Sequence, residues 1–141
     1  MKVKFNRAAL SEALALVGTV IPARTTKPIL QGLKIEAQKE KVLISATDFE
    51  TGITCLISQV QVEEKGDVVI PAERFAAIVR ECVDEVLELQ SAEGTCHVRG
   101  ADSHFTIYTH PSDQYPTVPG FDGEPQITAN LLKLQIGRAH V

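Results

Sequence analysis

The chain has 141 residues, of which 44% are hydrophobic and 23% are charged, so it is long enough for one domain with its own core. No run approaches the roughly 20 apolar residues that cross a bilayer. Residues 1–6 (MKVKFN) also lack the apolar stretch of a secretory signal, so we expect a cytoplasmic protein without a membrane partner. The net charge of -4 argues against a protein that holds nucleic acid through a basic surface, and any role on DNA would be local or topological.

The first half of the sequence predicts one strand, one helix and three strands. Residues 3–5 alternate in polarity like a short strand, and Asn6 can cap a helix that ends near Gly18. The apolar residues of that helix recur at helical spacing: Leu10, Ala13, Leu14 and Val17. After a loop over residues 21–28, alternating apolar residues mark three strand candidates at 33–37, 42–46 and 53–57.

The second half repeats this order. Residues 63–67 (EEKGD) favour a turn, residues 68–70 predict a strand, and Pro71 suits the first turn of a helix. The apolar stripe of this helix is Phe75, Ile78, Val79 and Cys82. Three more strands are expected at 86–89, 95–99 and 105–109, joined by tight turns at 92–94 and 100–102. The duplicated strand-helix-three-strand unit predicts an α+β domain in which two helices packed on antiparallel sheets share one core.

The composition changes at Pro111, because four prolines and two glycines fall within residues 111–125. Such a stretch is typical of a linker that lies over a domain surface. We therefore expect a first domain over residues 1–122 and the start of a second domain over residues 123–135. Residues 126–135 read as a strand that enters a helix near residues 131–135.

The cysteines and histidines give no sign of a metal site or of catalysis. The three cysteines are well separated and lie among apolar residues, so we interpret them as small, reduced core residues: Cys55, Cys82 and Cys96. The four histidines lack the i, i+4 spacing and the glutamate partner of a zinc hydrolase: His97, His104, His110 and His140. Neither a Gly-rich phosphate loop nor a nucleophile elbow is present, so we expect no enzyme, no metal and no cofactor.

The loop over residues 21–30 is the most distinctive segment. Pro22 and Pro28 restrict its backbone on either side of Arg24 and Lys27. Restrained cations suit phosphate, because they lose less freedom when they bind. A structural interpretation is equally open, in which the prolines end a helix and begin a strand while Arg24 caps carbonyls of the first helix.

Four motifs occur in order along the chain: residues 22–30 (PARTTKPIL), 47–53 (TDFETGI), 70–75 (IPAERF) and 113–119 (DQYPTVP). Through these motifs the chain resembles the first domain of the bacterial sliding clamp, the beta subunit of DNA polymerase III, over residues 1 to about 135. The resemblance implies three such domains per chain, dimerised head to tail into a six-domain ring around duplex DNA. It also implies a processivity factor without catalysis, which tethers the replicative polymerase and needs few cations, because strong ones would slow sliding.

The resemblance also implies roles for individual residues. Arg24 matches an arginine that touches DNA at the inner rim of the ring. Arg74 lies where the family commonly carries basic residues toward DNA or the partner subunit, although the neighbouring Glu73 departs from that pattern. Phe105 and Ile107 match apolar residues of the strand that pairs with the third domain of the partner subunit. Ordinary core positions on an alternating strand are the competing interpretation for that pair.

Other partners of such a ring would bind outside this chain. The groove that polymerases and the clamp loader use in this family lies between its second and third domains. Residues 136–141 (IGRAHV) do not match the helix that the family continues after Gln135, and we expect them to be a non-native tail. A second hypothesis stays open: a free-standing α+β protein- or ligand-binding module without a DNA role, which shares only the strand-helix repeat.

Overall fold

The structure is a computed structural model that describes residues 1–48, 51–116 and 134–136. The α-helices are α1 (Arg7–Val17) and α2 (Ala72–Glu81), and the 3-10 helices are η1 (Gly18–Val20), η2 (Pro28–Gln31) and η3 (Ser112–Gln114). The strands are β1 (Lys2–Asn6), β2 (Gly32–Gln38), β3 (Lys41–Thr47), β4 (Gly52–Ile57), β5 (Val60–Glu64), β6 (Gly66–Pro71), β7 (Val86–Ala92), β8 (Thr95–Arg99), β9 (His104–Tyr108) and β10 (Leu134–Ile136). None of the helices in these residues is long and apolar enough to cross a membrane.

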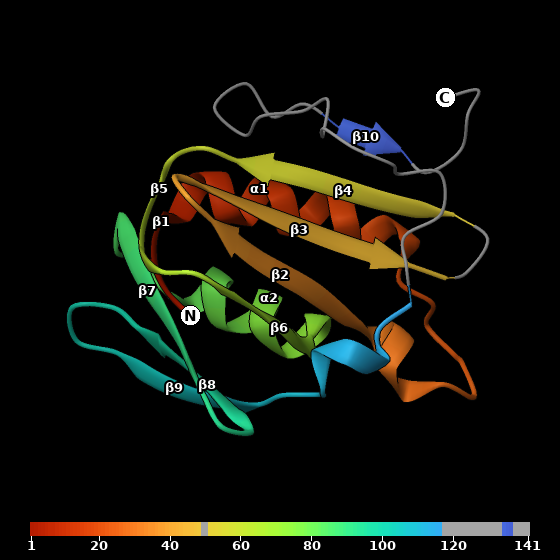
Figure 1. Cartoon of the computed structure of the whole chain (residues 1–141). Coiled ribbons are helices and arrows are strands. Elements are labelled where there is room, and N and C mark those ends of the chain that lie inside the picture. Colours follow the sequence, from red (N-terminus) through yellow and green to blue (C-terminus); the bar gives the residue numbers. More distant parts are fainter. Residues whose placement is uncertain (49–50, 117–133, 137–141) are drawn as a thin grey trace.

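The described strands form two antiparallel sheets that both helices help to cover. One sheet has the order β5-β1-β7-β8-β9 and the other has the order β10-β4-β3-β2-β6. Figure 1 shows the second sheet in front, with α1 and α2 behind it. The helix α1 contacts β3 and β4, α2 contacts β2 and β6, and the two helices contact each other. The expected α+β fold, with two helices packed on antiparallel sheets, is confirmed.

The strand before each helix lies in the sheet that the other repeat builds. Strand β1 pairs with β7 of the second repeat, and β6 pairs with β2 of the first. After β4 the chain returns through β5 to the free edge of β1. After β9 it returns to β6 through a single bridge between His110 and Val69. This reciprocal exchange follows the duplication seen in the sequence and joins both repeats into one domain.

The turn predicted over residues 63–67 was wrong. Residues 60–64 form β5, and β6 already begins at Gly66, so that only Lys65 separates the two strands. Gly66 has a φ of 150°, a backbone conformation that other residues rarely adopt. Strand β5 alternates only over Val60, Gln61 and Val62 before two glutamates follow, and none of its side chains is fully buried, so the pattern is too short to predict a strand.

The helix predicted near residues 131–135 was also wrong at its last two residues. Leu134 and Gln135 lie in β10, which pairs antiparallel with β4. An edge strand such as β4 presents unpaired backbone groups that an extended segment satisfies and a helix does not. Ile136, the first residue of the expected tail, belongs to β10 as well. The expected domain boundary at residue 122, with residues 123–133 and 137–141, lies outside the described residues.

A continuous apolar core fills the space between helices and sheets. Asn6 caps α1 as predicted, since its side-chain oxygen accepts a hydrogen bond of 3.0 Å from the Ala9 backbone N–H. Both predicted helical stripes are buried in this core. All three cysteines are buried free thiols, as interpreted from the sequence. Burial raises the pKa of Cys55 and Cys96 to about 12, so these thiols stay protonated at neutral pH.

The first part of the Pro-rich segment is anchored to the domain by Tyr115. Its buried hydroxyl donates a hydrogen bond of 3.3 Å to the Gly32 carbonyl and accepts one of 3.1 Å from the Thr47 backbone N–H. Burial raises the pKa of this phenol to about 12. The domain therefore extends at least to residue 115, and Tyr115 joins it to the adjacent strands β2 and β3.

Candidate functional site

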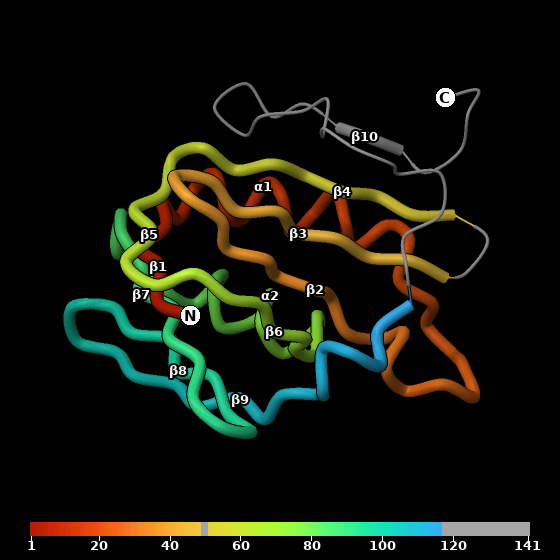
Figure 2. The backbone as a smooth tube through the Cα atoms, in the orientation of Figure 1, coloured from red at the N-terminus to blue at the C-terminus, as the bar shows by residue number. Residues whose placement is uncertain are grey.

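A hollow of about 720 Å³ lies between the loop after α1 and the first turn of α2. The loop contributes Ile21, Pro22 and Ala23 to its wall, and α2 contributes Ala72, Glu73 and Arg74. The two segments that carry the predicted DNA-contacting arginines are therefore neighbours in space, although they lie about 50 residues apart in the sequence. Figure 2 shows this loop leaving the end of α1 and returning to the start of β2.

The backbone around Arg24 is held on both sides. The Gln31 side-chain amide donates a hydrogen bond of 3.2 Å to the Ala23 carbonyl. On the other side, the Lys27 backbone N–H donates a bond of 3.0 Å to the Thr25 hydroxyl. Arg24 itself is exposed and follows directly after the wall residue Ala23. A cation on such a tethered loop loses less freedom when it binds phosphate.

The capping role considered for Arg24 is filled by other residues. The Gly18 backbone N–H donates to the carbonyls of Leu14 and Leu16 at the end of α1. The Thr19 hydroxyl donates a further bond of 2.8 Å to the Leu16 carbonyl. Within the described part of the chain, the Arg24 side chain forms no hydrogen bond or ion pair, so its guanidinium is available to an external anion.

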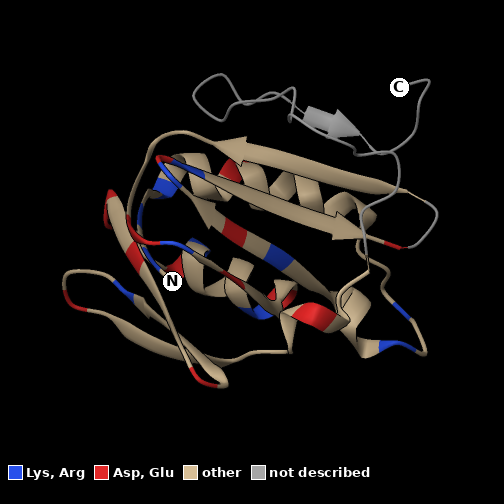
Figure 3. Ribbon diagram, in the orientation of Figure 1, with Lys and Arg blue, Asp and Glu red and all other residues tan. Residues whose placement is uncertain are grey.

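Arg74 lies in the first turn of α2, where it is exposed beside the hollow. This end of the helix is preceded by Pro71 and has no side-chain capping hydrogen bond, so backbone N–H groups and the helix dipole favour an anion there. The exposed Glu73 opposes that attraction. At the other end of α2, Arg80 is likewise exposed beside Glu81. The helix thus offers a weak, local attraction for a polyanion, and Figure 3 shows the same mixture of signs across the described chain.

The second predicted site lies on β9, which has β8 on one side and no described strand on the other. Ile107 is only 1% exposed and belongs to the core of this domain, and Phe105 is half-buried against that core. Tyr108 faces the opposite way and is 78% exposed. Ile107 is therefore buried in the core behind the edge strand, whereas Phe105 and Tyr108 are at least partly exposed to solvent. Contact of Phe105 and Ile107 with a partner subunit stays a prediction.

The backbone of β9 offers hydrogen-bonding groups that the sequence pattern did not reveal. The Gly100 N–H donates to the Ser103 carbonyl at 2.9 Å, and the Thr109 N–H donates to the Gly94 carbonyl at 3.1 Å. Bonded and non-bonded pairs alternate along an antiparallel ladder. Thr106, opposite His97, occupies a non-bonded position by this alternation, so its N–H and C=O point away from β8. Every residue except proline has the same backbone N–H and C=O, so residue types alone cannot show which of these groups are unpaired. The strand register is needed to identify them.

Comparisons with known proteins agree on one family. Residues 1–119 match the family model described as DNA polymerase III beta subunit, N-terminal domain. The beta sliding clamp of Streptomyces coelicolor is 29% identical over 119 residues, which cover 84% of this chain and 31% of that protein. The beta sliding clamp of Pseudomonas putida is 29% identical over 142 residues, which cover 98% of this chain and 37% of that protein. The chain thus spans about a third of the length of these relatives.

Solved structures agree with this match. The DNA polymerase sliding clamp of Bacillus subtilis superposes with a TM-score of 0.81 at 27% identity, over 84% of this chain and 33% of that one. The pol III beta of Caulobacter crescentus gives a TM-score of 0.79 at 28% identity, over 84% of this chain and 32% of that one. In both cases the likeness covers most of this chain and about a third of the longer protein.

Proposed function

The chain belongs to the DNA polymerase III beta subunit family, whose N-terminal domain it matches over residues 1–119, and on this premise we propose that it supplies the first domain of a replication sliding clamp. The complete ring encircles duplex DNA, tethers the replicative polymerase and catalyses no reaction. The family match is the observation that carries this proposal. A binding module that shares only the repeat is not favoured, because the match extends over most of the chain.

The exposed faces of the helices suit a surface that DNA slides past. Ala8, Glu12 and Ala15 are exposed on α1, and α2 adds two arginines and two glutamates. Small side chains of mixed charge provide little fixed contact with phosphates. A closed ring retains DNA topologically, so it needs only a few cations at the surface, and strong ones would hinder movement. A net charge of -4 is compatible with this mode of retention.

The edge strand β9 suits the contact with a second subunit. A strand of the partner can add to its outward backbone groups, while the half-buried Phe105 and the exposed Tyr108 pack against the partner. Ile107 supports this strand from the core. Head-to-tail pairing of two complete subunits closes the ring in the cytoplasm. The polymerase and the clamp loader bind domains that follow this one.

Removing the two cations beside the hollow, Arg24 and Arg74, is expected to weaken the interaction of the clamp with DNA. In a complete clamp, the combined change Arg24→Ala and Arg74→Ala reduces clamp loading on DNA without altering the fold. The logarithm of the binding constant falls as the logarithm of the salt concentration rises, and each lost phosphate contact makes this negative slope shallower by about 0.9. Loading assays and binding titrations at several salt concentrations measure both effects.

Lys39→Ala is the control for each arginine, because it removes one positive charge from an exposed turn at the other end of β2. This variant should load like the parent protein. Unchanged loading and an unchanged salt slope in the double variant would remove Arg24 and Arg74 from the DNA contacts. If that variant still forms a ring, the proposed clamp function stands even though the two arginines do not contact DNA.

A further inference from the structure

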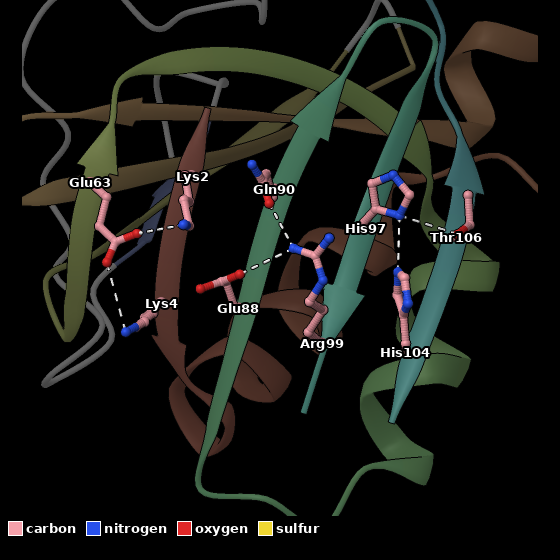
Figure 4. Close-up of polar contacts among 9 residues, drawn as sticks. All are labelled: Lys2, Lys4, Glu63, Glu88, Gln90, His97, Arg99, His104 and Thr106. Carbon is pink, nitrogen blue, oxygen red and sulfur yellow. Dashed lines mark hydrogen bonds and ion pairs between the residues drawn. The ribbon is translucent and has the colours of Figure 1, made fainter. Parts of the chain in front are cut away.

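Two histidines meet on the outward face of the sheet that contains β8 and β9. His97 of β8 and His104 of β9 are diagonal neighbours in the register, since His97 lies opposite Thr106 and His104 lies opposite Arg99. Nδ1 of His97 and Nε2 of His104 are 3.0 Å apart, and the ring centroids are 5.2 Å apart. Figure 4 shows the two rings with these nitrogens directed at each other.

This separation is close to that of two ligands on one metal ion. Two imidazole nitrogens bound to one tetrahedral zinc ion, at Zn–N distances of about 2.0–2.1 Å, stand about 3.3 Å apart. To hold such an ion the two nitrogens would have to open by about 0.3 Å, and both rings would have to turn so that their lone pairs meet at the ion and not at each other. His104 is exposed and His97 is half-buried, so the His104 ring has the greater freedom to turn. The adjacent strands fix the two Cα positions, so little further ordering is needed.

The proton balance of the pair also allows metal binding. In the hydrogen-bonded pair, one of the two facing nitrogens carries a hydrogen and the other accepts it. When that hydrogen moves to the other nitrogen of the same ring, both facing nitrogens present lone pairs. The ion then takes the place of the shared hydrogen, and two neutral rings release no proton.

The surroundings leave the pair accessible. Arg99 is the nearest cation on this face, but its guanidinium is directed to β7, with 3.2 Å to Glu88 and 2.6 Å to the Gln90 side-chain oxygen. The Thr106 hydroxyl lies 3.3 Å from Nδ1 of His97 and can contact a bound ion or its water. No group of three or more His, Cys, Asp or Glu residues gathers in the described part of the chain, so water would have to complete the coordination of a bound ion.

From this geometry we propose that His97 and His104 form a two-histidine site for a late first-row divalent cation such as zinc, nickel or copper. Imidazole ligands suit these ions, which lie at the strong end of the affinity order for nitrogen donors. The spacing of the histidines in the sequence does not fit a helical metal motif. His97 and His104 are seven positions apart, and the register of β8 and β9 brings their rings together. The proposal is independent of the proposed clamp function, because it rests only on the β8–β9 pairing.

Calorimetric titration of the 141-residue chain with zinc chloride tests the site. His97→Gln and His104→Gln are each expected to weaken zinc binding at least tenfold, since a single imidazole cannot chelate. His110→Gln and His140→Gln serve as controls, because they remove histidines outside the pair, and they should change the affinity less than twofold. Zinc should also shift the ring nitrogen NMR signals of His97 and His104 together, with saturation at one ion per chain.

Zinc binding of equal strength in the parent chain and in the variant that lacks both histidines would overturn the proposal. The pair would then serve only as a hydrogen bond between two imidazoles. The NMR shifts are measured on the parent chain, so they still test the site if a glutamine variant folds poorly. Zinc shifts confined to His110 or His140 would likewise contradict the assigned site.

Discussion

Replacing Phe75 by alanine is expected to lower the free energy of unfolding of this chain by about 3–5 kcal/mol. The Phe75 side chain is 0% exposed and extends from α2 into the core that both helices share with the sheets. Its removal loses the transfer free energy of a buried ring and leaves a cavity that the paired strands around it cannot close. Urea unfolding monitored by circular dichroism measures the difference.

Arg80→Ala is the matched control for this change, because Arg80 is exposed on the same helix and forms no ion pair among the described residues. Its effect should stay within about 0.5 kcal/mol. A loss below about 1 kcal/mol for Phe75→Ala would contradict the packing described for α2. It would mean that the core does not depend on this helix.

Replacing Thr106 by proline is expected to weaken self-association of the complete protein at least tenfold. Proline removes the outward N–H of β9 and places its ring where a partner strand would approach. The change leaves the ladder to β8 intact, since this N–H does not donate to it, and proline is tolerated on edge strands in that orientation. Sedimentation equilibrium of the complete protein reports the dimer, and circular dichroism reports the fold.

Thr106→Ala separates the backbone effect from loss of the side chain. It keeps the N–H and removes the hydroxyl, including its contact with His97. This variant should associate like the parent protein. If Thr106→Pro remains folded and dimerises as tightly as Thr106→Ala, then β9 is not the edge that joins two subunits.

The elements with strong periodicity were the ones that could be predicted from the sequence. Both helices follow from apolar residues at helical spacing, and Asn6 identifies the start of α1 through a specific hydrogen bond. Strand β2 buries alternating residues, whereas β3 and β4 are buried along nearly their whole length, and their apolar residues mark all three strands. Strand β5 could not be found in this way, because it lies at a sheet edge and buries no side chain completely.

The candidate sites were predictable only in part. The prolines around Arg24 mark its loop, but the hollow that brings the loop beside Arg74 arises from packing between distant segments. Alternation groups Phe105 with Ile107 without telling whether they face the core or a partner. The His97–His104 pair depends on cross-strand register, and Tyr115 depends on a contact 68 residues away in the sequence. Such relations are set by tertiary structure rather than by local pattern.

Retention on circular DNA tests the central claim most directly. The complete protein would be loaded onto a nicked circular plasmid, separated from free protein by gel filtration, and then exposed to an enzyme that cuts the plasmid once. A ring that holds DNA topologically stays with the circle and is released when the circle is linearised. Equal retention on circular and linear DNA, or no retention on either, would contradict the assignment of this domain to a sliding clamp.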